Sequence, residues 1–177
     1  VNSNYFSNID TEEKAYWLGV FYADGNISKE GEYKKIRFNT IDKDWLNSFI
    51  NAIEYSGTFH TETHKTYNKD IYCLTIGDDT LHDDLNTLGC VPNKTKVIVF
   101  PSIKESLIRH FIRGYFDGDG CISYGNKEHT IPTYQILGTK EFLKVIMSYL
   151  NIEETLFHNH NNKKEVTMYI QASSRKA

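Results

Sequence analysis

The sequence lacks the features of a membrane-spanning or exported chain. Its apolar runs are shorter than the roughly 20 residues that a membrane-spanning helix needs. Residues 1–10 do not contain the charged, apolar and small-residue blocks of a secretory signal. We therefore expect an intracellular protein without a membrane partner, in the cytoplasm or associated with a nucleoid or an organelle.

Cysteine is scarce in the sequence. The three cysteines among the 177 residues are an odd number and form no CxxC pair. This pattern argues against a disulfide framework and against a structural zinc site of the usual spacing. We interpret Cys73, Cys90 and Cys121 as reduced and mostly buried.

The sequence also has no excess of positive charge. Its 20 Lys and Arg residues and 23 Asp and Glu residues give a net charge of −3. A phosphate backbone responds to the local field on one face, so net charge alone does not exclude DNA binding. The basic residues do cluster, at Lys34, Lys35 and Arg37, at Lys65 and Lys69, and at Lys163 and Lys164, although any one cluster could be a solvated turn.

Aromatic residues are abundant, at 14% of the chain, and 40% of the residues are hydrophobic. This composition lies far from that of disordered chains, and the length allows a sizeable core. We expect one compact domain or two small, tightly joined halves.

The chain contains an internal repeat. The segment WLGVFYADG at residues 17–25 returns as IRGYFDGDG at residues 112–120, and Asp24 and Asp119 lie 95 residues apart at matching positions. Helical spacing of large residues in 44–53 returns in 141–150, and alternating apolar residues follow in both halves.

Each half is predicted to form an αββαββα unit of an α+β fold with antiparallel sheets. Capping boxes from Asp10 to Glu13 and from Ser102 to Glu105 predict where the two motif helices begin. Strands are expected near residues 26–40, 57–77, 121–137 and 155–170, with turns at Gly31, 68–70, 125–127 and 161–163. We expect a first half at 1–89, a linker at 90–100 and a second half at 101–177.

Each motif helix ends in an acid, Asp24 or Asp119, where the helix dipole disfavours negative charge. Gly19 and Gly114 lie five residues earlier and would let the two helices pack closely. The acids would then meet, and a cation between them would keep both ionised. Mg²⁺ suits such a site, and phosphodiester hydrolysis is the matching chemistry. The alternative, that Gly25 and Gly120 are only C-caps, does not explain the duplicated acid.

The two motifs resemble those of single-chain LAGLIDADG homing endonucleases, and the likeness extends over nearly the whole chain. The resemblance implies motif helices at a central interface and two sheets forming a saddle on the major groove of a long double-stranded DNA target. It also implies a monomer with pseudo-twofold symmetry, in which Asp24 and Asp119 bind Mg²⁺ or another divalent cation such as Mn²⁺. Ca²⁺ would occupy the site without supporting cleavage.

The sequence departs from the family's motifs at Leu18, Tyr22 and Arg113, none of which is the metal-binding acid. Residues 92–95 resemble the family's segment leading into the second motif, where a lysine often lines the active site. Lys94 is thus our catalytic candidate for polarising the phosphate or water network, or else a simple phosphate contact.

Two other metal-binding patterns compete with this interpretation. Residues 117–128 place acids at calcium-loop positions, but Ile122 stands where an EF-hand needs glycine. His60 with His64, and His158 with His160, share strand faces, yet the sequence shows no cysteine or acidic partners at ligand spacing. We interpret these histidines as polar, DNA-facing side chains.

We predict a site-specific double-stranded DNA endonuclease, with a non-cutting RNA maturase or DNA-binding regulator of the same fold as the alternative. Loss of a motif acid would have favoured the alternative, but both acids are present. Strand side chains of alternate parity would contact bases or phosphates. The candidates are Asn26, Ser28, Lys35, Arg37, Asn39, Thr61, Lys65, Ser123, Tyr134, Gln135 and Asn159.

The two halves end differently. Residues 78–88 follow the last strand of the first half with helical spacing, and Gly89 is a candidate C-cap. Only residues 171–177 follow the matching point of the second half. We therefore expect a fragment whose second half lacks its last helix, and the start at Val1 fits the same interpretation.

Overall fold

The computed structural model describes residues 1–66, 68–92, 94, 97–124 and 132–152, and the backbone alone of 157–159 and 167–173. Its first half contains α1 (Glu12–Ala23), β1 (Asn26–Glu30), β2 (Tyr33–Thr40), α2 (Lys43–Ala52), β3 (His60–His64), β4 (Lys69–Ile76) and α3 (Asp79–Thr87). Its second half contains α4 (Glu105–Asp119), β5 (Gly120–Tyr124), β6 (Pro132–Thr139), α5 (Lys140–Leu150), β7 (Phe157–Asn159) and β8 (Thr167–Ser173).

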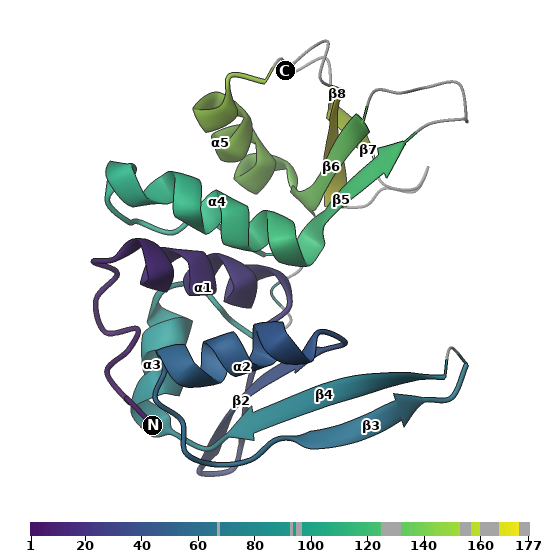
Figure 1. Cartoon of the computed structure of the whole chain (residues 1–177). Coiled ribbons are helices and arrows are strands. Elements are labelled where there is room, and N and C mark those ends of the chain that lie inside the picture. The colour runs from purple at the N-terminus through teal and green to yellow at the C-terminus, as the bar shows by residue number, and fades with distance from the viewer. Residues whose placement is uncertain are drawn as a thin grey trace.

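The two halves share one topology. The first sheet has the strand order β1-β2-β4-β3 and the second the order β5-β6-β8-β7, with antiparallel neighbours throughout. The predicted α+β fold with two repeated halves is therefore confirmed. Figure 1 shows α1 and α4 side by side at the centre, with α2 and α3 near the first sheet and α5 near the second. Among the described residues, no helix has the length and apolar character needed to span a membrane.

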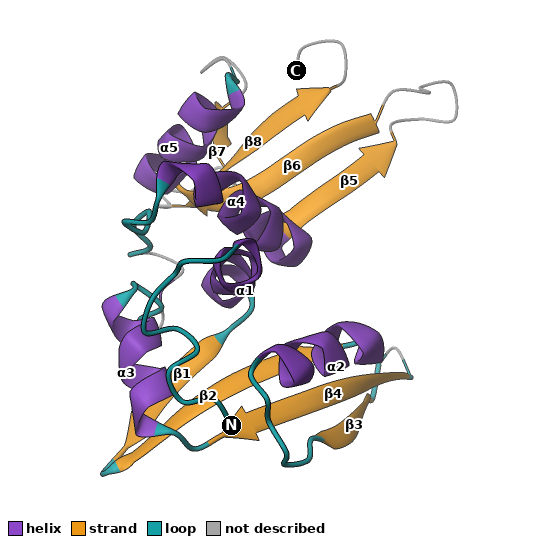
Figure 2. Cartoon of the chain, turned by 60° about the vertical axis from the view of Figure 1, so that its left-hand side comes forward, coloured by secondary structure: helices purple, strands orange, loops and turns teal. Residues whose placement is uncertain are grey.

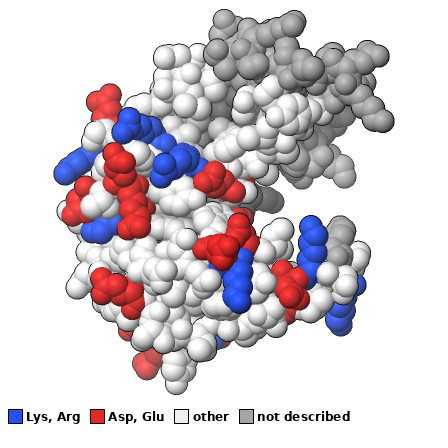
Figure 3. All heavy atoms as spheres, viewed as in Figure 1, with Lys and Arg blue, Asp and Glu red and all other residues white. Residues whose placement is uncertain are grey.

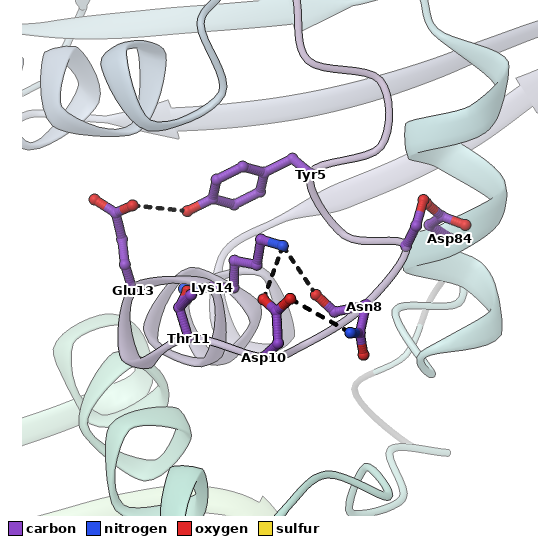
Figure 4. A network of polar contacts seen from close by, with 8 residues as sticks. Tyr5, Asn8, Asp10, Thr11, Glu13, Lys14 and Asp84 are labelled. Carbon is purple, nitrogen blue, oxygen red and sulfur yellow. Dashed lines mark hydrogen bonds and ion pairs between the residues drawn. The ribbon is translucent and has the colours of Figure 1, made fainter.

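Both motif helices begin at residues other than the predicted caps. Thr11, not Asp10, caps α1, because its hydroxyl accepts the Lys14 N–H at 3.2 Å. The Asp10 carboxylate instead pairs with the Lys14 ammonium at 2.9 Å, as Figure 4 shows. The second capping box is also wrong, since Lys104 precedes α4 and no side chain caps this helix.

The N-terminal segment packs along the first half. Tyr5, Phe6 and Ile9 are buried in the core. Ser3 donates a hydrogen bond to Asp78 at 2.6 Å, and Ser7 donates one to Asp84 in α3. The Tyr5 hydroxyl reaches Glu13 of α1 (Figure 4). Residues 1–9 thus tie α1 to α3.

Helix α3 begins and ends as its sequence predicts. The Asp78 carboxylate accepts the Leu81 N–H at 2.9 Å, and Gly89 has a φ of 103° just after the helix. A left-handed backbone of this kind suits glycine, which has no Cβ to clash.

Each sheet has one face toward the helices and one away from them. In β2, Ile36 and Phe38 are buried, whereas Arg37 between them is half-buried and Asn39 after them is exposed, so alternate residues face opposite sides. Direct strand partners share a face, which assigns the side of every paired residue. We call the face that carries Lys35 and Arg37, together with its counterpart in the second half, the outer face.

The helix-side faces of the two sheets are covered differently. In the first half α3 packs on β1 and β2, and Ile27 is 2% exposed. In the second half Ile122, Tyr124 and Tyr134 share the face of buried Ile136 but are 54%, 69% and 37% exposed. The residues after Ser173 lie outside the described residues, so the missing last helix stays a prediction.

Candidate active site and nucleic-acid interface

Two glycines lie where the motif helices cross. A Cβ on Gly19 would overlap the Phe111 carbonyl and lie 2.7 Å from the Tyr115 nitrogen. A Cβ on Gly114 would overlap the Tyr16 carbonyl of the opposite helix. The backbones of α1 and α4 therefore touch directly, and this contact fixes how their C-terminal ends lie relative to each other (Figure 2).

Asp24 and Asp119 meet at those C-terminal ends. Asp24 follows α1 directly, and its N–H donates to the Val20 carbonyl at 2.9 Å. Asp119 is the last residue of α4. A Cβ on Gly118 would lie 3.1 Å from the Asp24 carboxylate, so a glycine in the second motif leaves room for the acid of the first.

The two carboxyl groups disfavour each other's ionisation. Burial, followed by the negative charge of Asp24, raises the pKa of Asp119 to about 6. Burial also raises the pKa of Asp24, which the positive charge of Lys94 opposes. Two partly buried acids at the negative ends of two helices form a site of negative potential.

Lys94 reaches the same site from the segment between the halves. Its ammonium donates a hydrogen bond to the Gly25 carbonyl, one residue after Asp24. Burial lowers the pKa of Lys94, while Cys90 and the two acids favour its charged form. Lys94 and Asp119 line a cavity of about 80 Å³ together with Tyr22 and Tyr115.

The donor set fits a hard divalent cation. Mg²⁺ binds through one or two carboxylates and otherwise keeps water or phosphate oxygens as ligands. A cation between Asp24 and Asp119 would remove the repulsion that raises the pKa of Asp119. The Tyr115 hydroxyl lies between the Leu137 carbonyl, at 2.8 Å, and the Asp119 carboxyl group, and its hydrogen bond to Asp119 opposes the rise in the pKa of that acid.

The departures from the family motif have structural explanations. The Arg113 guanidinium lies 4.7 Å from the centre of the Tyr16 ring, a cation–π contact between the halves. The Tyr16 hydroxyl donates to Asp117 at 2.8 Å and accepts from the Trp45 ring nitrogen at 2.9 Å. Tyr22 stacks edge-on against Phe111 and donates to the Leu88 carbonyl. Arg113 and Tyr22 thus hold the two halves together.

The backbone excludes the calcium-loop interpretation of the second motif, whereas Gly120 does occupy the C-cap position of α4, although without the left-handed conformation. Asp117 and Asp119 lie inside α4 and Gly120 begins β5, so residues 117–124 form no calcium-binding loop. Gly25 and Gly120 do not adopt the left-handed conformation of a C-cap glycine. Each is instead required by space, because a Cβ would overlap Phe21 or Phe116.

Most of the predicted DNA contacts lie on the outer faces. The register pairs Asn26 with Arg37 and Ser28 with Lys35, while Asn39 follows two residues after Arg37. In the second half the outer face carries Ser123 and Gln135. Lys65 lies in the turn between β3 and β4. The backbone of Asn159 lies in β7, but its side chain is outside the described residues.

Two predicted contacts fall on the helix side. Thr61 pairs with Tyr72, which shares the face of buried Leu74. Tyr134 pairs with Ile122 and shares the face of buried Ile136. Strand register decides these positions, and we remove both residues from the set of candidate DNA contacts.

The basic residues of the first sheet are partly neutralised. Lys35 and Arg37 approach Glu30 at 2.9 and 3.5 Å, and Lys34, on the helix side, pairs with Asp83 at 2.5 Å. Figure 3 shows basic and acidic side chains interspersed on one face, with basic atoms again at the far end of the β3–β4 hairpin. The outer face of the first sheet therefore carries mixed charge around Lys35 and Arg37.

The sequence interpretation missed one cluster on the outer face. The ligand atoms of His60, Glu62 and Cys73 all lie within 4.8 Å of one another. Cys73 belongs to the neighbouring strand β4, opposite His60, so a search for partners along β3 alone could not find it.

Comparison with known proteins gives a family and a fold. The profile of a family described as the LAGLIDADG-like domain matches residues 11–100 and 106–177. The I-LtrWI LAGLIDADG homing endonuclease bound to target DNA has 10% sequence identity and a TM-score of 0.57, over 98% of this chain and 80% of that chain. The homing endonuclease I-WcaI bound to its DNA recognition sequence has 15% identity and a TM-score of 0.57, over 94% and 80%. I-SmaMI bound to uncleaved DNA target in the presence of calcium ions has 12% identity and a TM-score of 0.52, over 94% of this chain and 80% of that chain.

Three relatives from Methanocaldococcus jannaschii match in sequence. A replication factor C small subunit is 30% identical over 125 residues, which are 68% of this chain and 6% of the relative. A DNA-directed RNA polymerase subunit, Rpo1C, is 28% identical over 63% of this chain and 13% of the relative. A protein described as uncharacterized is 24% identical over 86% of this chain and 60% of its own length. The chain therefore spans less than two thirds of each of these relatives.

Proposed function

The chain belongs to the LAGLIDADG-like domain family, and from this premise we propose that it is a site-specific endonuclease that hydrolyses both strands of double-stranded DNA. The observation that carries the proposal is that Asp119 and Lys94 line one cavity and that Asp24 lies close enough to influence the pKa of both. A protein that only binds nucleic acid needs the saddle but has no need for two mutually repelling acids at its centre.

Asp24 and Asp119 would hold the divalent cation, most suitably Mg²⁺ or Mn²⁺. When bound, such an ion lowers the pKa of an attacking water and stabilises the leaving oxygen of an in-line displacement. Because one acid comes from each half, each half would position one strand of the duplex. A monomer would then suffice to cut both strands.

Lys94 would act on the phosphate. Its ammonium lies among Asp24, Asp119 and the Gly25 carbonyl, so it can donate a hydrogen bond to a phosphate oxygen beside the two acids. Its lowered pKa also makes proton release easier than for a solvent-exposed lysine, since burial disfavours the charged form.

The outer faces of the two sheets would bind the DNA. Asn26, Arg37 and Asn39 offer amide and guanidinium groups of the kind that read bases, and Lys35 and Lys65 offer charges for phosphates. The opposite face of the first sheet is occupied by the helices and the core, so it is closed to a duplex.

The test is cleavage of a plasmid library of randomised targets with Mg²⁺. Asp24→Asn and Asp119→Asn should each abolish double-strand cleavage while retaining DNA binding, because the fold and the saddle remain. Asp117→Asn is the matched control, since Asp117 lies in the same helical turn but bonds to Tyr16, and it should still cut. Wild-type cutting by either motif variant would remove the acids from the mechanism. DNA binding by the wild type without cleavage of any library member would instead support a maturase or regulator.

A further inference from the structure

Three different metal-binding side chains meet on the outer face of the first sheet. The His60 Nε2 lies 3.0 Å from the Glu62 carboxylate, and Cys73 completes a group whose ligand atoms lie within 4.8 Å. In the part of the chain that the structure describes, no other three His, Cys, Asp or Glu side chains come close enough together to hold an ion. It lies apart from Asp24 and Asp119, which end the central helices.

Strand pairing brings the three side chains together. His60 in β3 is the direct partner of Cys73 in β4, and Glu62 follows His60 by two residues on the same face. Direct partners in antiparallel strands hold their Cβ atoms about 5 Å apart, which suits side chains that share a ligand. The cluster is therefore set by the register of two strands, which is more rigid than a loop.

The three donors select the type of ion. An imidazole nitrogen, a carboxylate oxygen and a thiolate sulfur are the ligands of zinc, whereas Mg²⁺ prefers oxygen alone. Tetrahedral zinc, with bonds of about 2.0 Å to nitrogen or oxygen and about 2.3 Å to sulfur, needs ligand atoms roughly 3.3 to 3.6 Å apart. The His60–Glu62 separation of 3.0 Å is already close to this spacing.

The cluster can also close around an ion. Cys73 is 5% exposed and held by its neighbours, whereas the side chains of His60 and Glu62 are 61% and 66% exposed. The two exposed side chains can change rotamer at small cost and approach the fixed sulfur.

We propose that His60, Glu62 and Cys73 form a binding site for Zn²⁺ or a similar borderline-soft divalent ion, with a fourth position open to solvent. The ion site is inferred only from the geometry of these three side chains. Its location within a DNA interface rests on the proposed function, and there the ion would offset the Glu62 charge that otherwise repels phosphate.

Proton balance gives the site a pH dependence. A cysteine thiol that is not bound to a metal carries its proton near neutral pH. Binding forms a bond from the metal to sulfur and releases the thiol proton to solvent, while His60 binds as the neutral imidazole. The cluster carries the single negative charge of Glu62 before the ion binds, and it is neutral with the ion and the thiolate in place. Because protons compete with the ion for the sulfur and the imidazole, the affinity for the ion should fall as pH falls.

The test is titration of the full chain with Co²⁺, which replaces Zn²⁺ and reports thiolate ligation by a near-ultraviolet charge-transfer band. One equivalent of Co²⁺ should produce the band, Zn²⁺ should remove it, and Cys73→Ser should lose it. Cys121→Ser is the matched control, since Cys121 is exposed in the other half, and it should keep the band. Glu62→Gln and His60→Ala should weaken Co²⁺ binding.

Two results would overturn the proposal: no thiolate band at saturating Co²⁺, or an unchanged band in Cys73→Ser. Ion binding at Asp24 and Asp119 gives no thiolate band, so it cannot imitate the expected signal. The measurement uses protein without DNA, so a failure to bind or cut DNA would leave the ion site intact and would count against the proposed function alone.

Discussion

Replacing Asp119 by Asn should stabilise the metal-free protein near neutral pH although it abolishes cutting. Burial and the charge of Asp24 raise the pKa of Asp119 from 3.8 to about 6. A folded-state pKa above the unfolded value means that the folded state holds its proton more tightly, so folding is penalised as pH rises from 3.8 through 6. Asparagine keeps the shape of the side chain and carries no charge, so it removes this penalty.

The size of the effect follows from the shift. At about 1.4 kcal/mol per pH unit, a change from 3.8 to about 6 corresponds to at most about 3 kcal/mol. Solvent screening at this partly exposed group reduces the expected gain to about 2 kcal/mol. For a chain of this length, such a gain raises the Tm by roughly 5 °C.

The assay is thermal unfolding of the wild type and Asp119→Asn in EDTA at several pH values. The advantage of the variant should be full above pH 6 and should vanish only as pH falls below 3.8, where both the folded and the unfolded wild type bind the proton. Mg²⁺ should narrow the gap, because it stabilises the wild-type pair by binding the folded state. A variant less stable than the wild type at neutral pH without metal would refute the reasoning.

Other predictions concern helix packing and the salt dependence of DNA binding. Gly114→Ala should lower the free energy of unfolding by about 2 kcal/mol or more, because its Cβ overlaps the Tyr16 carbonyl; Gly77→Ala, with its nearest neighbour 3.9 Å away, is the control, and equal urea midpoints would contradict the close crossing. DNA affinity should fall by about a thousandfold between 50 and 200 mM salt if about six phosphates are contacted, despite the net charge of −3; a flat response in a filter-binding assay would argue against the saddle.

The sequence predicted the features that depend on local pattern. The repeated motif placed Gly19 and Gly114 in equivalent helices, and helical spacing with Asp78 and Gly89 delimited α3 to within a residue. Such features follow from the spacing of apolar residues and from helix capping, and both depend on residues that are near one another in the sequence.

The features that the sequence did not predict depend on partners far along the chain. The register of β3 on β4 turned Thr61 to the helix side and brought Cys73 opposite His60. Tyr5 and Phe6 follow no helical or strand period, and they are buried because a pocket of the first half accepts them. No local pattern encodes such contacts.

The direct backbone contact at Gly19 and Gly114 limits which parts of the sequence can vary. The main chains of α1 and α4 touch there, so neither half can shift along the other without a clash that no side-chain rotamer relieves. The backbone contact thus determines the spacing between Asp24 and Asp119. The outer faces of the sheets take no part in this contact, so their side chains are free to diverge. A lineage of such chains could therefore acquire new recognition while its central geometry stays constant.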